Sequence, residues 1–342
     1  MDKAGQYCFV HPSGKGVFTY MLRNINKTEV IITNYGALIM SYKFKMPDGR
    51  VNDIVLGFEN VADYLNAEYL ATYPFMGAAI GRYANRIKGG CFRIDGKEFL
   101  VSKNWGADQL HGGFEGFDKK VWDFVSFDQD SNILKLKYRS PDGEEGFPGN
   151  LDVNICFELN DQNDLIYEYT ATCDQPTAVN LSHHSYFNLN NGQGTIENHE
   201  IKINSDCILE QNAYLVTTGN YIFVGNTRYD FRDFRPIGRE LADGYDQSFV
   251  IDNPSAQLCL AAEVHYQKVK LQILTTDPVV HFYTAQGLPR LKGKNNCQYG
   301  PYSGFCLETQ KHPNAINIAK FPDTILRPGG IYHQRNVYKV SA

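Results

Sequence analysis

The sequence predicts an all-β protein, a large antiparallel β-sandwich with very few short helices. Apolar and polar residues alternate in many segments, and Asp-Gly pairs stand between such segments. The composition points the same way, because the 342 residues include 22 Tyr, 21 Phe and 30 Gly but only 5 Met. Aromatic residues and glycines favour strands and turns, so we expect sheets rather than helices.

Five segments carry the strand pattern. In the longest, Leu151, Val153 and Ile155 line one face, since successive side chains of a strand point to opposite faces. The same alternation covers residues 151–159, 165–171, 133–138, 200–203 and 269–274. Both Asp and Gly tolerate the positive φ that hairpin turns need, so we expect such turns at Asp48-Gly49, Asp95-Gly96 and Asp142-Gly143.

Helical patterning is scarce. Short helices are expected only in residues 59–71 and 237–242. Strands and helices do not alternate along the chain, which argues against a parallel α/β fold. No linker, low-complexity tract or fixed-period repeat divides the sequence. We therefore expect residues 1–342 to form a single domain, although the length by itself suggests about two.

Charge and composition exclude several classes of partner. A net charge of −5 argues against binding to nucleic acid or to an anionic membrane, since both need a basic face. No window approaches the run of about 18 apolar residues that a membrane span requires, and the first residues lack the pattern of a signal peptide. The eight cysteines have none of the short spacings of zinc or redox motifs, so we expect reduced thiols in a cytoplasmic protein.

Five polar segments contain side chains that a strand-forming fold does not need: residues 81–87, 109–118, 180–189, 243–249 and 304–310. In the first, Arg82 and Arg86 are candidates for a forked donor site for sugar hydroxyls or a carboxylate. Taken alone, that segment favours a surface loop with solvated arginines. In the second, His111 precedes two glycines that would let the backbone approach a ligand, and an ordinary glycine turn explains it equally well.

The third segment contains His183 and His184. In an extended strand these side chains point to opposite faces, so one is expected in a pocket and the other in solvent or the core. Metal binding by two histidines of one strand prefers spacing i, i+2, so no metal is expected. Asp246 stands in a turn context, where a turn-capping role is the simpler interpretation. Glu308 suits a general base, and an edge-strand glutamate in water is equally consistent.

A glutamate and a histidine with opposite proton roles suit proton transfer at a hemiacetal carbon, and aromatic side chains suit stacking on a sugar ring. Taken together, the segments resemble the aldose 1-epimerases, or galactose mutarotases. The resemblance covers roughly residues 30 to 340. It is carried by residues 81–87 (GRYANRI), 109–122 (QLHGGFEGFDKKVW), 179–189 (VNLSHHSYFNL), 244–249 (GYDQSF), 304–310 (GFCLETQ) and 321–329 (FPDTILRPG).

This resemblance implies a large antiparallel β-sandwich that interconverts the α and β anomers of hexoses such as D-galactose and D-glucose without a cofactor. Glu308 resembles the family's general base, which removes the proton of the C1 hydroxyl. His184 resembles the general acid, which protonates the ring oxygen. The implied partner is a small hexose, bound by a monomer or weak dimer. Substrate contacts are implied for Asn85, Arg86, His111 and Asp246.

A few positions depart from the family pattern. Gln247 stands where His is common, and His183 stands where Asn is often found. His281 and Gln286-Gly287 replace parts of a common Gln-x-Tyr-Thr-Gly-Asn pattern. That segment is expected to border the sugar, so its changes bear on substrate preference more than on catalysis.

Three other functions remain open. A hexose-6-phosphate 1-epimerase would need basic residues for the phosphate, and Arg82 and Arg86 are the obvious pair. A non-catalytic sugar-binding protein would have lost Glu308 or His184, and neither is lost. A glycoside hydrolase would need two carboxylates, for which Asp246 and Glu308 are the candidates, and would leave the histidine motifs unexplained.

Overall fold

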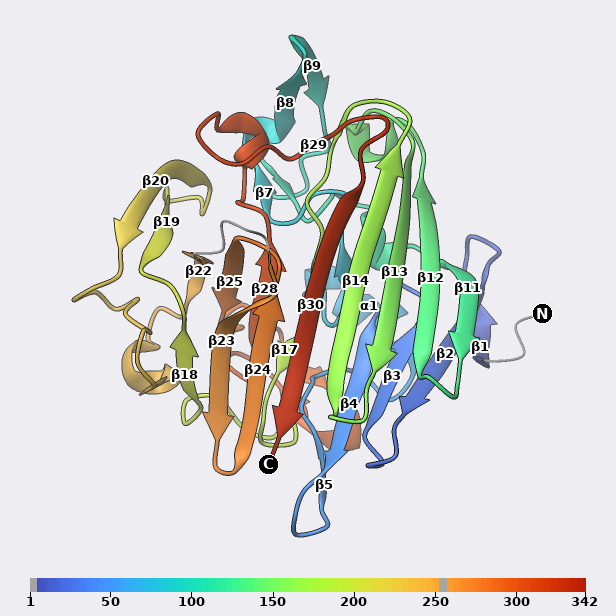
Figure 1. The fold of residues 1–342 in the computed structure, drawn as a ribbon, viewed down its shortest axis with the longest axis vertical. Helices are drawn as coiled ribbons and strands as arrows, with labels where there is room; N and C mark the ends of the chain where they lie inside the picture. Colours follow the sequence, from blue (N-terminus) through green and yellow to red (C-terminus); the bar gives the residue numbers. More distant parts are fainter. Residues whose placement is uncertain (1–4, 252–256) are drawn as a thin grey trace.

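A computed structural model describes residues 5–251 and 257–342 of the chain. Most of the strand residues in the described part of the chain lie in three large antiparallel sheets arranged in two layers (Figure 1). The helices are short, so the predicted all-β sandwich is confirmed. Among the described residues, no helix is long and apolar enough to cross a membrane.

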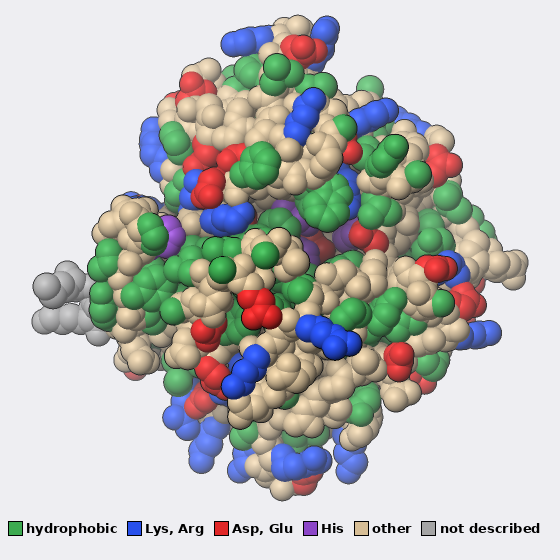
Figure 2. Space-filling model, turned by 180° about the vertical axis from the view of Figure 1, so that it is seen from behind, with side chains coloured by type: hydrophobic (Ala, Val, Ile, Leu, Met, Phe, Trp, Pro, Cys, Tyr) green, Lys and Arg blue, Asp and Glu red, His purple; other side chains and the backbone are tan. Residues whose placement is uncertain are grey.

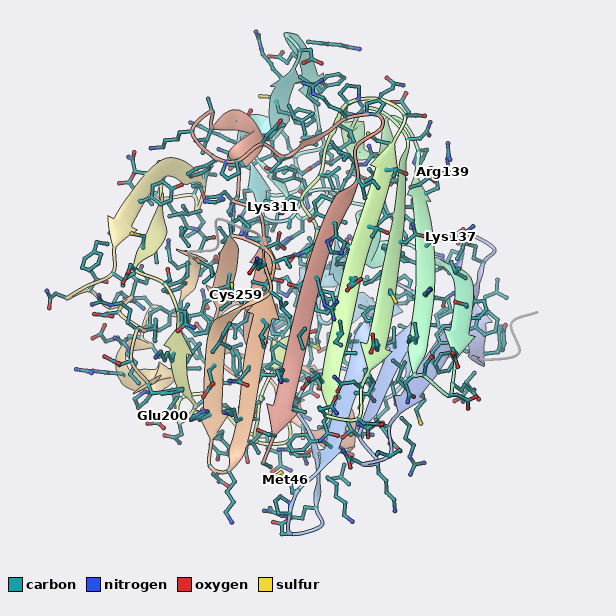
Figure 3. All side chains as sticks on the ribbon, in the orientation of Figure 1. Met46, Lys137, Arg139, Glu200, Cys259 and Lys311 are labelled. Carbon is teal, nitrogen blue, oxygen red and sulfur yellow. The ribbon has the colours of Figure 1, made fainter. Side chains whose placement is uncertain are left out.

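The largest sheet has nine strands and forms the layer nearest the viewer in Figure 1. The five segments with predicted strand alternation all belong to it. On β12 (Ile133–Ser140) the side chains of Lys137 and Arg139 lie on the solvent face (Figure 3). In spatial order the strands are β11 (Asp123–Asp128), β12 (Ile133–Ser140), β13 (Leu151–Leu159), β14 (Asp164–Cys173), β30 (Tyr332–Ser341), β24 (Val269–Thr275), β23 (Cys259–Tyr266), β18 (Glu200–Ile203) and β21 (Arg235–Pro236).

Two further sheets lie behind this one and form the second layer. The apolar core fills the space between the layers and includes Ile32, Ile155 and Phe282, one from each large sheet. The five-stranded sheet has the order β1 (Gln6–Val10), β2 (Gly16–Arg23), β3 (Glu29–Thr33), β4 (Ile39–Lys45) and β5 (Val51–Asp53). The six-stranded sheet has the order β17 (Tyr186–Phe187), β28 (Phe305–Gln310), β25 (Val279–Tyr283), β22 (Asp246–Val250), β19 (Cys207–Gln211) and β20 (Thr217–Phe223).

Short two-stranded ribbons lie outside these large sheets. They are β6 (Ala79–Ile80) with β16 (Ser182–His183), β7 (Arg86–Ile87) with β10 (Gln109–Leu110), β8 (Cys91–Ile94) with β9 (Lys97–Leu100), β15 (Thr177–Ala178) with β29 (Ile325–Leu326), and β26 (Leu291–Lys292) with β27 (Gln298–Tyr299). The first two ribbons contain residues of three polar segments of the sequence, 81–87, 109–118 and 180–189.

The predicted turns are present in two forms. Asp95 and Gly96, with φ of 51° and 80°, form a two-residue turn between β8 and β9, and Asp48-Gly49 lies in the short connection from β4 to β5. At Asp142-Gly143 the connection is longer, because residues 141–150 join β12 to β13 and contain a 3₁₀ turn.

The two predicted helical segments are shorter than expected. Residues 59–71 contain a 3₁₀ turn and a separate α-helix, because Asn66 between them has an extended backbone with ψ of 141°. Residues 237–242 contain only a 3₁₀ turn. The α-helix is α1 (Ala67–Thr72), and the 3₁₀ turns are η1 (Val61–Leu65), η2 (Lys88–Gly90), η3 (Phe117–Lys119), η4 (Glu144–Gly146), η5 (Ile237–Glu240), η6 (Lys294–Asn296) and η7 (Ala315–Asn317).

All eight cysteines are free thiols, as predicted.

Candidate active site

A cavity of about 290 Å³ gathers the polar segments of the sequence. In Figure 2, which shows the molecule from behind, histidine and acidic side chains lie at the bottom of a hollow near the middle of the surface. The residues predicted to be functional all line this cavity: Asn85, Arg86, His111, His184, Asp246 and Glu308. The sequence therefore identified the segments that meet here, although they are far apart along the chain.

The floor of the cavity is one face of the neighbouring strands β22, β25 and β28. Ser248 lies opposite His281, and His281 lies opposite Glu308 in the register of these strands. Because side chains alternate along a strand, Asp246, His281 and Glu308 share the cavity face. The intervening residues pack in the apolar core instead: Phe249, Val280, Phe282, Phe305 and Leu307.

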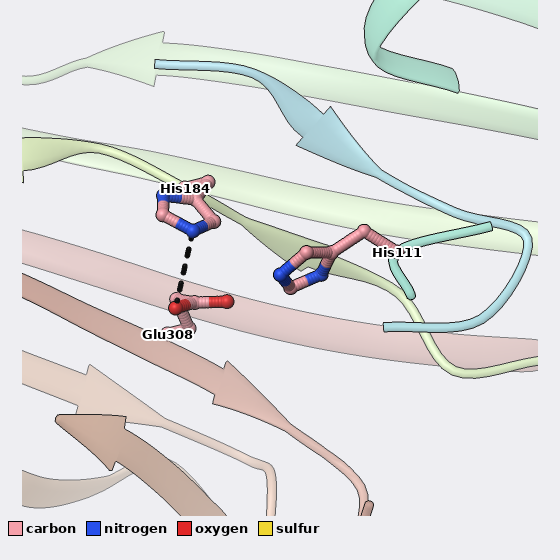
Figure 4. Close-up of side chains that lie close together, drawn as sticks. All are labelled: His111, His184 and Glu308. Atoms are coloured by element: carbon pink, nitrogen blue, oxygen red, sulfur yellow. Dashed lines mark ion pairs between the residues drawn. The ribbon is translucent and has the colours of Figure 1, made fainter. Parts of the chain in front are cut away.

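His184 and Glu308 face one another across this floor (Figure 4). His184 Nε2 lies 3.5 Å from Glu308 Oε1. Glu308 is only 2% exposed, so the alternative of an edge-strand glutamate in water is wrong. Its second oxygen, Oε2, has no hydrogen-bond partner within the described part of the chain. One carboxylate oxygen is thus free to contact a ligand.

The two adjacent histidines point to opposite faces, as expected for an extended segment. His183 faces the core, where its ring nitrogens lie 3.1 Å from Ser185 Oγ and 3.3 Å from the carbonyl oxygen of Ala37. His184 lines the cavity, with its ring stacked against the rings of Phe75 and Tyr186. Burial lowers the pKa of His184, and the nearby charge of Glu308 opposes that shift.

His111 is fixed by reciprocal hydrogen bonds with Asn85. The His111 backbone N–H donates to the Asn85 carbonyl oxygen at 3.0 Å, and the Asn85 N–H donates to His111 Nδ1 at 3.2 Å. Burial lowers the pKa of His111 well below its ordinary value, so the ring is neutral near neutral pH. Since Nδ1 accepts a hydrogen bond, the proton of the neutral ring resides on Nε2, and His111 is a fixed donor.

This tautomer bears on metal binding. The ligand atoms of His111, His184 and Glu308 lie within 4.8 Å of one another, close enough to hold an ion. A histidine binds a metal through a ring nitrogen with a free lone pair. In His111 one nitrogen accepts from Asn85 and the other carries the proton. The cluster therefore suits proton transfer and hydroxyl binding better than metal coordination.

Asp246 is held by His281. His281 Nε2 lies 2.9 Å from Asp246 Oδ1, and His281 Nδ1 lies 2.9 Å from Ser248 Oγ. Burial alone would raise the pKa of the Asp246 carboxyl, but the hydrogen bond from His281 and the charge of Arg86 hold it below its ordinary value. Asp246 is thus an ionised acceptor on the first residue of β22 rather than a turn cap.

The two arginines of residues 81–87 have different roles, and both are buried, so the interpretation as a solvated surface loop is wrong. Arg82 is turned away from the cavity, where its guanidinium donates to the carbonyl oxygens of Pro148 and Gly149 and to the hydroxyl of Ser140. Arg86 lines the cavity, and its guanidinium lies 5.9 Å from the ring centre of Trp105. Only Arg86 can contribute to the expected donor site.

The glycines after His111 approach the protein's own atoms rather than a ligand. Gly112 has φ of 91°, and a Cβ there would lie 1.9 Å from the carbonyl oxygen of Gly81. A Cβ on Gly113 would lie 2.1 Å from a carboxylate oxygen of Glu145. Only glycine fits at these positions because there is no room for a Cβ. The tight fit fixes His111 beside Asn85.

Several cavity residues were not predicted. Phe75, Trp105 and Tyr283 form aromatic walls, and no sequence pattern distinguishes them from the many core aromatics. Of the departures from the family pattern, His281 and Gln286-Gly287 line the cavity, as expected for a segment that borders a ligand. Gln247 instead donates a hydrogen bond from its amide to the backbone of Leu209.

Comparisons with known proteins agree with this geometry. The sequence model of the aldose 1-epimerase family matches residues 19–339. The chain is 40% identical to human galactose mutarotase over 339 residues, which is 96% of each chain. It is 33% identical to the aldose 1-epimerase of Escherichia coli strain K12 over 343 residues, or 97% of each chain.

Solved structures show the same fold. The crystal structure of an aldose epimerase homologue from C. elegans has a TM-score of 0.87 and 28% identity, with 99% of each chain covered. That of galactose 1-epimerase from Lactobacillus acidophilus has a TM-score of 0.85 and 25% identity, with 98% of each chain covered. Because the family match and the relatives span nearly the whole sequence, the chain belongs to the aldose 1-epimerase family.

Proposed function

We propose that this protein is a mutarotase that interconverts the α and β anomers of aldohexoses such as D-galactose and D-glucose. The observation that carries the proposal is the 3.5 Å contact between His184 Nε2 and Glu308 Oε1 on the floor of the cavity. The C1 hydroxyl oxygen and the ring oxygen of a pyranose are bonded to the same carbon. An acid and a base in contact with each other can therefore reach both oxygens of one bound sugar.

In the proposed reaction, Glu308 accepts the proton of the C1 hydroxyl while the protonated ring of His184 donates its Nε2 proton to the ring oxygen. The C1–O5 bond breaks and leaves an open-chain aldehyde. Rotation about C1–C2 then presents the other carbonyl face. On closure the roles are exchanged, since His184 takes the proton back and Glu308 returns its proton to the new C1 hydroxyl. Only protons move, so this chemistry needs no metal or redox cofactor.

The remaining polar groups hold the sugar. We assign His111 as a fixed hydroxyl donor through Nε2, Arg86 as a cationic donor and Asp246 as an ionised acceptor, because each lines the cavity. Asn85 also lines it, but its side-chain oxygen accepts the Arg86 backbone N–H at 2.9 Å. Asn85 therefore acts mainly by positioning His111 and Arg86.

Two alternative reactions fit the cavity less well. A glycoside hydrolase would use Asp246 and Glu308 as its two carboxylates, which leaves His111 and His184 of the cavity without a role. A hexose-6-phosphate epimerase needs several cations for its phosphate. Among the described residues that line the cavity, Arg86 is the one lysine or arginine. Arg82 does not reach the cavity, since its guanidinium donates to backbone carbonyls.

Polarimetry on freshly dissolved α-D-galactose tests the proposal. We expect the protein to accelerate the approach to the equilibrium rotation far beyond the uncatalysed rate in the same buffer. Parallel measurements with glucose and glucose 6-phosphate distinguish the two epimerase classes. A rate equal to that of buffer with both free hexoses would contradict the proposed function.

We further propose that residues 1–342 form one domain that acts in the cytoplasm as a monomer or weak dimer. The single-domain proposal is supported by one core cluster that includes Tyr20 near one end of the chain and Val340 near the other. The compartment is supported by eight free thiols, which suit a reducing environment. Sedimentation of the purified protein over a range of concentrations tests the oligomeric state.

A further inference from the structure

A buried thiol that the reaction scheme does not use lies directly behind His184. Cys306 Sγ is 3.5 Å from His184 Nδ1, the ring nitrogen that does not face Glu308. Figure 4 shows this second ring nitrogen turned away from the carboxylate. Cys306 is fully buried, and it lies on β28 two residues before Glu308, on the same face of the strand. Both nitrogens of His184 therefore have a partner from β28.

We propose that Cys306 is a positioning residue that holds the Nδ1 side of His184 and tunes its strength as an acid. The acid role of His184 rests on the proposed mutarotase activity, whereas the contact between Cys306 and His184 does not depend on that activity. A thiol is both a weak donor and a weak acceptor of hydrogen bonds. It can accept from the Nδ1–H of a protonated ring, and it can donate to Nδ1 when the proton of the neutral ring is on Nε2.

The contrast with His111 shows why the type of partner matters. His111 Nδ1 faces a backbone N–H, which can only donate, so that ring is held neutral with a fixed tautomer. His184 Nδ1 faces a group that tolerates both ring states. The cavity thus contains one histidine that is fixed as a hydroxyl donor and one that is free to gain and lose a proton.

A weak acceptor also suits the acid role. A carboxylate at Nδ1 would stabilise the charged ring strongly and make it a poor acid. The ring oxygen of a sugar is a weak base, so its protonation needs a ring that releases its proton readily. A thiol supplies enough interaction to orient the charged ring without holding its charge firmly.

The other titratable groups around His184 come from several elements, and of these Tyr186 also contacts Cys306. Facing the ring are Glu308 from β28, His281 from β25, Asp246 from β22, His111 from residues 109–118, and the phenols of Tyr186 and Tyr283. A substitution at Cys306 leaves these charges in place. Any change in the titration of His184 would therefore report on the lost sulfur contact.

The experiment compares wild-type protein with Cys306→Ala and Cys306→Ser. In Cys306→Ala the ring keeps the hydrogen bond to its own backbone but loses the sulfur contact at Nδ1. We expect the alkaline limb of the kcat/KM profile to move to lower pH by about half a unit to one unit, the equivalent of one modest hydrogen bond. At neutral pH, kcat/KM should fall about three- to tenfold with little change in KM. The serine of Cys306→Ser can both donate and accept a hydrogen bond, so this variant should return the alkaline limb most of the way to its wild-type pH.

Cys259→Ala is the matched control. Cys259 is partly buried, and its sulfur also has a hydrogen bond, to the carbonyl oxygen of Thr275. It lies on the nine-stranded sheet, away from the cavity (Figure 3). This variant should keep the wild-type profile. Thermal melts of all variants separate loss of fold from loss of tuning, because a purely structural role for Cys306 lowers the melting temperature without moving the alkaline limb.

A ¹⁵N NMR titration of the His184 ring gives a readout that does not depend on turnover. We expect the titration midpoint to move to lower pH in Cys306→Ala and to return in Cys306→Ser. An unchanged midpoint together with an unchanged kcat/KM profile in Cys306→Ala would overturn the inference. If the wild-type protein has no mutarotase activity but the NMR midpoint moves, the proposed function fails while the contact between Cys306 and His184 stands.

Discussion

His184 and Glu308 meet because of the register between β17 and β28. Tyr186 lies opposite Cys306 in that antiparallel pair. His184 comes two residues before Tyr186, just outside β17, and Glu308 comes two residues after Cys306. Because the pairing is antiparallel, these two residues lie side by side on the same face, with Nε2 and Oε1 3.5 Å apart. A shift of one residue in this register would turn one of the two side chains into the core. The proposed acid and base are thus positioned by strand pairing rather than by a flexible loop.

The first prediction concerns the proposed base. Glu308→Gln keeps the shape of the side chain but removes its ability to accept a proton. We expect the rate of mutarotation to fall by a factor of roughly 10² to 10⁴, the usual contribution of a positioned general base. Polarimetry measures the rate, and circular dichroism should show an unchanged fold. Near-normal activity in this variant would refute the assignment of Glu308.

The second prediction concerns the proposed acid. His184→Asn keeps a polar group on the cavity floor but cannot donate the Nε2 proton. We expect kcat to fall about 100-fold or more, while KM changes by much less, since other side chains hold the sugar. Initial rates over a range of galactose concentrations separate the two constants. A variant with wild-type kcat and a raised KM would instead make His184 a binding residue.

The third prediction uses the two arginines as a matched pair. Arg82→Met leaves the carbonyl oxygens of Pro148 and Gly149 without their buried donor, so we expect the free energy of unfolding to fall by about 3 kcal/mol or more. Arg86→Met should lower activity with a much smaller effect on stability, because Arg86 faces the cavity. Urea denaturation and polarimetry of both variants check this. Equal loss of stability in the two would contradict the division of roles.

The fourth prediction concerns stability in acid. Burial lowers the pKa of His183 to about 3, and it lowers those of His199 and His312 to about 4. In the unfolded chain these groups titrate near the ordinary value of about 6.5. Between pH 6.5 and these lowered values the unfolded state binds more protons. The free energy of unfolding should therefore be highest above pH 6.5 and fall as the pH falls, by up to about 1.4 kcal/mol per pH unit for each group.

His183→Asn tests the largest of these contributions. Asparagine has both a donor and an acceptor for the two partners of His183, but it does not titrate. Denaturation at several pH values between 4 and 7 should give a shallower loss of stability for the variant than for the wild type. If the free energy of unfolding falls equally steeply with pH in the variant and the wild type, His183 does not contribute to the acid sensitivity.

The periodic parts of the fold were predictable because their signal is local. Alternation over residues 151–159 reflects burial of one strand face, and this burial is visible in the sequence itself. The helix expected over residues 59–71 was less predictable, because an extended Asn66 divides it. Whether one residue adopts a helical or an extended backbone depends on tertiary contacts as well as on its type.

For the cavity, residue types alone favoured a solvated loop at residues 81–87 and a turn cap at Asp246, and the resemblance to the aldose 1-epimerases identified the segments that line it. The sequence could not show whether Arg82 is buried or solvated, because its partners are backbone carbonyls at distant positions. It also could not identify Phe75 and Trp105 as cavity walls among so many aromatic residues.

The sequence by itself determined the strand-forming pattern, the family and the segments that hold the polar side chains. Only the tertiary structure decided which atoms of those side chains meet, because contacts between strands depend on register and on which face is buried. The pairing of β17 with β28 brings His184 to Glu308 and places Cys306 behind the ring. The fit of Gly112 against Gly81 fixes His111 beside Asn85. Each of these contacts joins residues distant along the chain, so no local pattern could encode it.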